Sequence, residues 1–139
     1  MDEGKPRVAK LAAMHDVSGF ESGSPALDRY IALHALQSQR AQVAQTYAAV
    51  VGEKVVGYHT LVVGSIAYEE APQRLVKGIP RHPVPMMLLA RLAVDRTWQG
   101  KGLGVALVAD AMRRVAQAAD IAGVRAMVVH AKDETARRF

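Results

Sequence analysis

The sequence predicts a single α/β domain in which a central mixed, twisted sheet is flanked by helices. Two antiparallel strands are indicated by residues 46–51 and 55–66, because the tight turn Gly52-Glu53-Lys54 separates them. A strand–helix–strand unit follows between residues 86 and 129, and such a unit pairs its strands in parallel through a right-handed crossover. The chain has 139 residues, which is enough for one hydrophobic core and too few for two.

The first half of the chain should begin with a helix over residues 25–38, ahead of the hairpin. Ser24 provides an N-cap and Pro25 the first helical position. The side chains predicted to form the packed face of this helix recur at helical spacing and are Leu27, Tyr30, Ile31 and His34.

The second half alternates between a long loop, a buried strand and a helix. Residues 67–85 contain four prolines after Glu70 and read as a loop, and loops of this length are often functional. Residues 86–94 form an almost continuous apolar run, typical of a strand buried on both faces. Gly102 opens a helix that ends at Ala122-Gly123, residues 124–129 form the next strand, and residues 133–135 begin a final helix. The predicted apolar face of the long helix consists of Val105, Val108, Ala109, Met112, Val115, Ala116 and Ala119.

Composition and charge narrow the classes of function. The chain has no cysteine, so it has no disulfide, thiol nucleophile or thiolate metal site, and its five histidines show no metal-ligand spacing. No stretch approaches the ~20 apolar residues of a membrane span, and the N-terminus lacks a secretory h-region. We therefore expect a cytoplasmic protein that contacts no membrane and needs no metal. The net charge of +5 favours encounter with polyanions, although a basic surface can also serve solubility alone.

The most informative segment runs from Arg91 to Gly104, where three glycines alternate between a buried strand and a helix N-terminus. Unpaired amides and the helix dipole make such a place suited to phosphate, and Lys101 adds a full positive charge. A Walker loop is excluded because Gly102, not Ser or Thr, follows Lys101. The dinucleotide fingerprint is excluded because Val105 and Leu107 occupy the positions of its third glycine. A tight strand-to-helix turn without a ligand is the remaining alternative.

The spacing Gln-Gly-x-Gly-x-Gly after Leu-Ala-Val-Asp resembles the acetyl-CoA signature of the GNAT acetyltransferase superfamily. The resemblance implies the GNAT fold, with acetyl-CoA as co-substrate. It also implies that the strand containing Leu92, Ala93 and Val94 pairs with the pantetheine arm and splays from residues 125–130, so that the thioester lies in the cleft between them. The residues whose backbone amides would cradle the pyrophosphate are Gln99, Gly100, Lys101, Gly102, Leu103 and Gly104.

Further segments resemble the subgroup of GNAT proteins that contains the acetyltransferase toxins of bacterial toxin–antitoxin pairs. They are residues 20–23, 27–30, 35–40, 55–59, 131–134 and 136–139. This resemblance implies a homodimer that acetylates the α-amine of aminoacyl-tRNA, blocks translation and is neutralised by a ribbon-helix-helix antitoxin. The basic balance suits tRNA, whose binding depends on phosphate neutralisation. The positive residues that we expect near the cleft are Lys77, Arg81, Arg91, Lys132, Arg137 and Arg138.

The toxin subgroup protonates the leaving thiolate with a tyrosine directly after the position that matches Phe139, where this chain ends. The alternatives are a shortened chain, further residues after Phe139, or a substitution that puts Phe139 at the tyrosine's position; the spacing favours a C-terminally truncated domain that lacks the two closing strands. The catalytic residue is then unknown, and the chain should bind CoA better than it turns over. Of the other acid–base candidates, His130 is better placed than His59. The residues for which packing roles are expected are Tyr30, Tyr47, Tyr58, Tyr68 and Trp98.

Two other functions remain open at this point. The glycine loop fits equally a GNAT enzyme that acetylates protein N-termini or small amines. A shortened chain could also be a non-catalytic module that holds CoA or an antitoxin.

Overall fold

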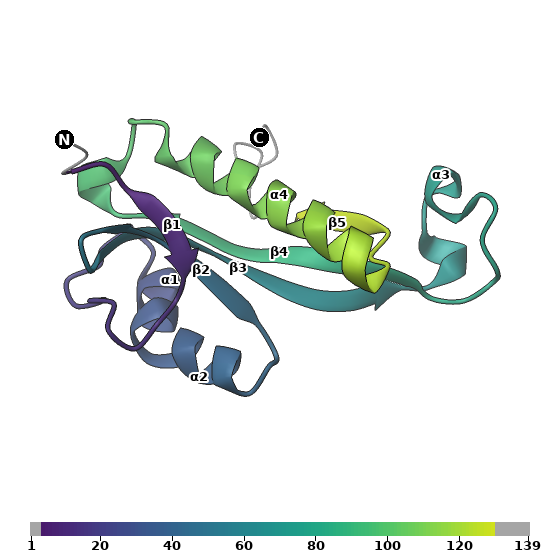
Figure 1. The fold of residues 1–139 in the computed structure, drawn as a ribbon, viewed down its shortest axis with the longest axis horizontal. Helices are drawn as coiled ribbons and strands as arrows, with labels where there is room; N and C mark the ends of the chain where they lie inside the picture. Colours follow the sequence, from purple (N-terminus) through teal and green to yellow (C-terminus); the bar gives the residue numbers. More distant parts are fainter. Residues whose placement is uncertain (1–3, 130–139) are drawn as a thin grey trace.

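The computed structural model describes residues 4–129, which form one five-stranded sheet with helices on both faces (Figure 1). The strands are β1 (Arg7–Lys10), β2 (Gln45–Val51), β3 (Lys54–Ile66), β4 (Val84–Val94) and β5 (Ala126–Val129), and they lie in the sheet in this order. Strands β1 to β4 are antiparallel to their neighbours, whereas β5 runs parallel to β4. The predicted mixed sheet is therefore confirmed, although β1 was not anticipated and β5 begins two residues later than expected.

One face of the sheet is covered by the helical segment that follows Ser24. It consists of α1 (Pro25–Arg29), a π-helical turn η1 (Tyr30–His34) and α2 (Ala35–Arg40). The Ser24 hydroxyl accepts a hydrogen bond from the Leu27 amide, which confirms the predicted cap. The prediction for His34 was wrong, because the wider π turn adds a residue to this part of the helix. Ala35, not His34, is therefore buried after Tyr30 and Ile31, and His34 is exposed.

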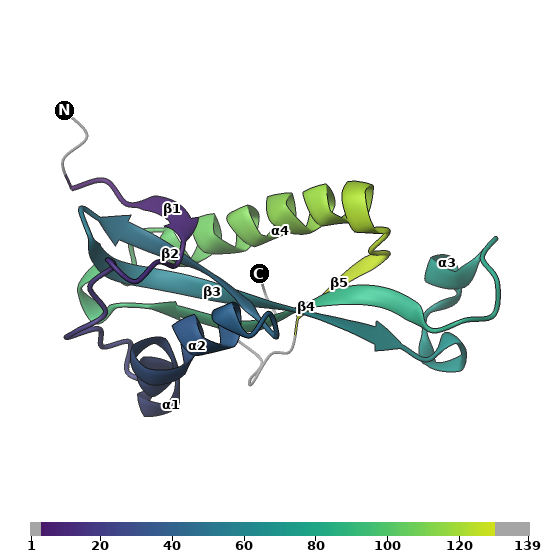
Figure 2. The same cartoon turned by 60° about the horizontal axis from the view of Figure 1, so that its bottom comes forward.

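The opposite face is covered by α4 (Leu103–Ala122), as Figure 2 shows. Its boundaries agree with the sequence, since Gly102 is the N-cap and Gly123 closes the helix in the left-handed conformation. Its predicted apolar face was only partly right, since Val115 is buried as expected. The buried residues of the helix are Leu103, Leu107, Asp110, Ala111 and Val115, whereas Val105 and Met112 are 67% and 56% exposed.

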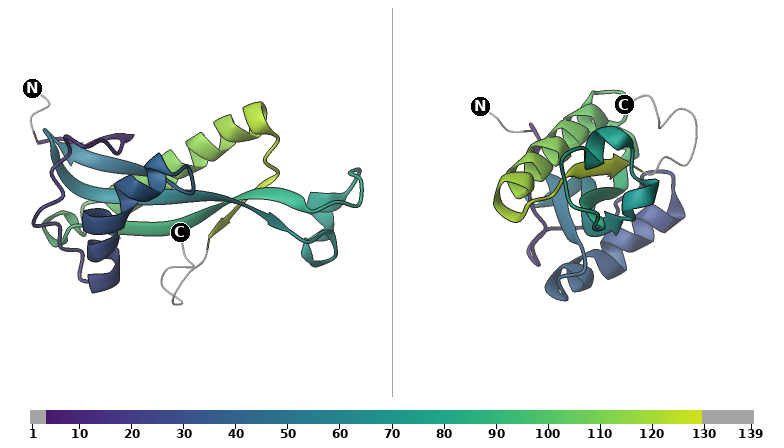
Figure 3. Two further views of the ribbon diagram at one scale, coloured as in Figure 1. Left: turned by 90° about the horizontal axis from the view of Figure 1, so that it is seen from below. Right: turned by 90° about the vertical axis from the view of Figure 1, so that its right-hand side faces the viewer.

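The hairpin of β3 and β4 continues beyond the helices into an arm formed by residues 67–83. The arm contains a 3₁₀ turn η2 (Tyr68–Glu70) and the short helix α3 (Gln73–Val76), and it lies at the end of the molecule far from the start of α4 (Figure 3). The Arg125 side chain donates a hydrogen bond to the Leu75 carbonyl and so ties the arm to the beginning of β5. Within residues 4–129, no helix is long and apolar enough to cross a membrane.

Candidate active site

The site begins at the end of the ladder that β4 and β5 form within the described residues. Their parallel ladder joins Met86–Leu89 to Ala126–Val129, while β4 continues through Val94 with β3 alone as its partner among the described residues. Among residues 4–129, the main chain of residues 90–94 thus has no strand partner on the β5 side. At the start of this open stretch, Leu61 pairs with Leu89 and Thr60 with Arg91, so Ala90 is the extra residue of a β-bulge. A bulge leaves the extra residue outside the ladder, which frees its backbone polar groups for another partner.

The start of α4 lies just beyond the end of this strand and forms the second part of the site. Gly100 and Gly102 have φ values of 76° and 85°, which a residue with a Cβ resists, so the turn itself requires both glycines. Gly104 differs, because its φ is not left-handed and an added Cβ would meet only Val94, at 3.9 Å. No side chain caps the first turn and no acidic residue lies in it. The amides of this turn are therefore available to a negatively charged group.

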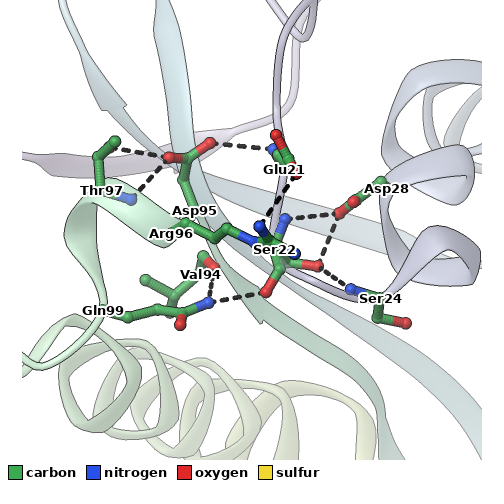
Figure 4. Close-up of polar contacts among 9 residues, drawn as sticks. All are labelled: Glu21, Ser22, Ser24, Asp28, Val94, Asp95, Arg96, Thr97 and Gln99. Atoms are coloured by element: carbon green, nitrogen blue, oxygen red, sulfur yellow. Dashed lines mark hydrogen bonds and ion pairs between the residues drawn. The ribbon is translucent and has the colours of Figure 1, made fainter.

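A buried carboxylate holds the glycine loop to the N-terminal segment (Figure 4). Asp95 accepts hydrogen bonds from the Glu21 amide at 3.0 Å and from the amide and hydroxyl of Thr97 at 3.0 and 2.8 Å. Burial by itself would raise the pKa of Asp95, but these hydrogen bonds outweigh it and the pKa is lowered. Asp95 is therefore ionised at neutral pH and fixes the turn that precedes the glycines.

Gln99 makes a second link between the same two segments. Its side-chain amide donates to the Ser22 carbonyl at 2.8 Å and to the Val94 carbonyl at 2.9 Å. Ser22 in turn donates through its amide and hydroxyl to Asp28 in α1. The Gln99 side chain thus holds the loop in place, while its backbone amide donates a hydrogen bond of 3.4 Å to the Arg96 carbonyl.

The basic residues expected near the cleft lie in different places. Arg91 lies on β4 beside the bulge, and its guanidinium stacks on the Tyr30 ring at 3.7 Å. Lys77 and Arg81 lie on the arm, where Arg81 pairs with Glu69 at 2.7 Å, so the fold separates them from the glycine loop. Lys101 lies over the Trp98 ring at 5.1 Å, next to the start of α4. Lys132, Arg137, Arg138, His130 and Phe139 lie outside the described residues, as do residues 133–135.

The acid–base candidates in the described part of the chain are engaged elsewhere. His59 is fully buried between β3 and α4, where its Nε2 lies 2.8 Å from Asp110. Tyr58 donates its hydroxyl proton to the Leu27 carbonyl, and burial raises its pKa. Tyr30 stacks on Tyr58, Tyr47 packs against His59, and Tyr68 lies under Arg81, as expected for packing roles.

Three features of the site escaped the sequence. Ala90 gave no signal, because a bulge depends on the register of two strands. The role of Asp95 depends on Glu21, 74 positions away. Asp110 could have been noticed as a carboxylate in phase with Leu103 and Leu107, which marks a polar residue inside an apolar helix face. Within residues 4–129, no group of three or more potential metal ligands occurs, and nothing in the site resembles a metal centre.

Comparison with known proteins agrees with this geometry. The profile of the Acetyltransferase (GNAT) family matches residues 12–139. A tRNA-acetylating toxin of Mycobacterium tuberculosis is 42% identical over 130 residues, which cover 94% of this chain and 78% of that protein. The structure of AtaT complexed with acetyl-methionyl-tRNAfMet has a TM-score of 0.87 and 30% identity, and covers 94% of this chain and 81% of AtaT.

A second AtaT structure is also similar. It contains a tyrosine-to-phenylalanine mutant toxin bound to acetyl-CoA and to the C-terminus of the antitoxin AtaR, with a TM-score of 0.81, 28% identity, and coverage of 96% of this chain and 79% of that one. The family profile matches most of the chain, and the structure has the start of α4 without a side-chain cap beside the end of β4. The chain therefore belongs to the GNAT family of acetyltransferases.

Proposed function

We propose that this protein is a toxin that transfers the acetyl group of acetyl-CoA to the α-amine of aminoacyl-tRNA and thereby blocks translation. The observation that carries the proposal is the 42% identity, over nearly the whole chain, to a protein that acetylates tRNA. The AtaT complex with acetyl-methionyl-tRNAfMet supports the same substrate class.

In this proposal, acetyl-CoA lies along the open edge of β4 and ends at the start of α4. The main chain of Leu92, Ala93 and Val94 pairs with the pantetheine arm, on the side where no strand partner lies among the described residues. The backbone amides from Gln99 to Gly104 bind the pyrophosphate, and Lys101 adds positive charge beside them. The chemistry supports this division, because pantetheine offers amide groups to a strand whereas pyrophosphate needs uncapped donors.

The reaction needs a neutral amine, a stabilised oxyanion and a proton for the departing sulfur. An α-amine has a pKa of about 7.7–8.0, so a useful fraction is neutral without a strong base. The amine attacks the thioester carbonyl, whose oxygen becomes negative; we assign the amide freed by the Ala90 bulge as a donor to it. The attacking nitrogen then loses a proton to water, the carbonyl re-forms as the carbon–sulfur bond breaks, and the CoA thiolate leaves and takes up a proton to give the free thiol. None of the four tyrosines of the described region serves as the acid in this proposal, because each packs elsewhere.

On the acceptor side, we propose that Arg91 contacts the 3′ end of the tRNA close to the reacting amine. Its guanidinium is held flat by Tyr30 and has no carboxylate partner among the described residues, so it remains free to bind phosphate. Lys77 and Arg81 on the arm would contact a more distant part of the same tRNA. Lys132, Arg137 and Arg138 complete the proposed basic surface.

The partners follow from the same similarity. We propose that a cognate antitoxin of the ribbon-helix-helix class neutralises the protein, since AtaT is bound by its antitoxin AtaR. We also propose a homodimer, and the cytoplasm as the compartment, because charged tRNA is found there.

The acceptor can be tested with the full-length protein, labelled acetyl-CoA and three separate substrates: bulk aminoacyl-tRNA, deacylated tRNA, and a mixture of peptides and polyamines. Label is expected on aminoacyl-tRNA alone, and mild alkaline hydrolysis should release it as an N-acetyl amino acid. Label confined to peptides or polyamines would show that the acceptor is wrong while leaving the acetyl-CoA site intact.

A further inference from the structure

A buried polar cluster joins the sheet to α4 and is not used by the chemistry above. His59 on β3 has no exposed surface, and its Nε2 lies 2.8 Å from Asp110 Oδ2 on α4. The same Asp110 oxygen accepts a hydrogen bond from Arg114 Nε at 2.7 Å, and Arg113 lies 3.6 Å from the other oxygen. Arg114 also stacks on the Tyr47 ring at 3.8 Å. The cluster therefore spans two strands and one helix.

The protonation states in the cluster follow from burial and from its hydrogen bonds. Burial lowers the pKa of His59 despite the neighbouring carboxylate, so the imidazole is neutral at pH 7. Burial by itself would raise the pKa of Asp110, but hydrogen bonds from Arg114 and His59 lower it. The neutral ring then donates Nε2–H to the carboxylate. Its Nδ1, which has no hydrogen-bond partner among the described residues, is left as an acceptor rather than as an unpaired donor.

The cluster lies between the two parts of the proposed acetyl-CoA site. His59 is paired in register with Leu92, in the stretch of β4 assigned to pantetheine. Asp110 lies seven residues after Leu103, the first residue of α4, and so about 10 Å along the helix from the amides assigned to pyrophosphate. The hydrogen bond from His59 to Asp110 thus connects β3, the neighbour of the pantetheine strand β4, to the helix whose start is assigned to the pyrophosphate.

Asp95 and Gln99 hold the loop that precedes α4, whereas the contacts around Asp110 on the helix itself are mostly apolar. Leu107 and Ala111, on either side of Asp110, are fully buried among aliphatic side chains of the sheet. Apolar contacts are non-directional and tolerate small shifts, whereas a hydrogen bond requires a narrow range of distance and angle. A buried polar pair contributes little net stability compared with an apolar pair of similar size.

We propose that His59 and Asp110 are positioning residues that fix α4 along β4, and so set the separation between the pantetheine strand and the pyrophosphate amides. This inference rests on the acetyl-CoA site of the proposed function. It assigns His59 no contact with substrate and no proton transfer.

The test compares the affinity of the protein for acetyl-CoA with its affinity for a cofactor fragment that lacks pantetheine. The double variant His59→Leu/Asp110→Leu replaces the polar pair by apolar side chains, and isothermal titration gives Kd values for acetyl-CoA and for 3′-phospho-ADP, which lacks pantetheine. The Kd for acetyl-CoA should rise by about 10- to 100-fold, because the affinity gained by binding two linked groups at once depends on their sites being correctly separated. The Kd for 3′-phospho-ADP should change less than twofold, because each half of the site remains intact. The KM for acetyl-CoA should rise accordingly.

Two further variants separate positioning from stability. Thr46→Val removes an equally buried hydrogen bond, to Thr60 at 2.8 Å between β2 and β3, and should leave both Kd values unchanged. His59→Gln retains an amide donor near the position of Nε2 and should recover most of the acetyl-CoA affinity. If the double variant does not fold, Asp110→Asn, which loses charge but little volume, is measured in its place.

The outcomes are distinct. An acetyl-CoA Kd that stays within twofold of wild type in a folded double variant overturns the inference, and so does an equal loss of affinity for both ligands. Failure of the wild-type protein to bind acetyl-CoA refutes the proposed function, and the inference with it. Tight binding without acetylation of aminoacyl-tRNA refutes only the proposed acceptor.

Discussion

Gly57 determines how closely α4 approaches the sheet beside the cofactor strand. It lies on β3 opposite Val94, and a Cβ at this position would lie 3.1 Å from Leu107 Cδ1 and 3.2 Å from both Leu103 Cδ2 and the Ala93 carbonyl oxygen. Carbon atoms in contact are ordinarily about 3.5–4.0 Å apart. The two leucine ends can rotate slightly, but the backbone carbonyl cannot. Gly57→Ala should therefore push the first turn of α4 outward.

The expected cost follows from this overpacking. Extra methyl groups in packed cores destabilise by about 1–3 kcal/mol. Replacing glycine by alanine also lowers the conformational entropy of the unfolded chain, which offsets about 0.4–1 kcal/mol of this loss. We expect a net loss of about 1–2 kcal/mol in the free energy of unfolding, measured by urea denaturation, or a fall in Tm of about 4 °C per kcal/mol. The Kd for acetyl-CoA should also increase, because Leu103 carries the amides at the start of α4.

Gly64→Ala is the matched control on the same strand. Its Cβ would lie 3.5 and 3.6 Å from the flexible end of Met86, which is ordinary contact, so stability should be unchanged or slightly higher. Adding Leu103→Val to Gly57→Ala should recover part of the lost stability by removing one of the clashing atoms. Equal stability of Gly57→Ala and Gly64→Ala would refute the reasoning.

Three further predictions concern the loop and the buried histidine. Gly104→Ala should keep or raise stability by up to about 1 kcal/mol, since Gly104 is helical and an added Cβ would be unobstructed. It should nevertheless weaken the binding of acetyl-CoA. An unchanged Kd for acetyl-CoA in a titration would contradict the assignment of residues 99–104 to the pyrophosphate. Asp95→Ala should cost about 2 kcal/mol in urea denaturation, because it removes a helix cap and the hydrogen bond to Glu21, and a loss below about 0.5 kcal/mol would argue against this anchor. Burial lowers the pKa of His59, so below about pH 6.5 the unfolded chain binds more protons than the folded protein. The free energy of unfolding should therefore decrease as the pH is lowered below about 6.5, by up to about 1.4 kcal/mol per pH unit. Denaturation of His59→Gln should lack that part of the slope, and identical slopes would refute the assignment.

Local features of the sequence determined much of the fold and the cofactor site. The hairpin turn, the cap at Ser24 and the boundaries of α4 depend on residues within a few positions of each other, and all are found where expected. The glycine loop is also locally determined, because the turn depends on the left-handed backbone of Gly100 and Gly102 rather than on distant residues. The family could therefore be inferred before any coordinates.

The face that α4 buries was decided only by the tertiary structure. Alanine and valine occupy so much of the helix surface that a 3.6-residue period fits more than one apolar face. The predicted face was the one that contains Val105 and Met112, which are exposed. The observed face includes a carboxylate, Asp110, which periodicity excludes from a core. It is buried because His59 and Arg114 meet it from β3 and from the next turn of the helix.

The sequence by itself thus determined most of the elements, though not β1, and the loop that identifies the family. The bulge at Ala90, the anchoring of the loop by Asp95 to Glu21, the separation of Lys77 from Arg91, and the placing of α4 were decided by the tertiary structure. The physical reason is the range of the interactions. Capping, turns and periodicity act between near neighbours in the chain, whereas register, packing and buried polar contacts exist only when distant segments meet.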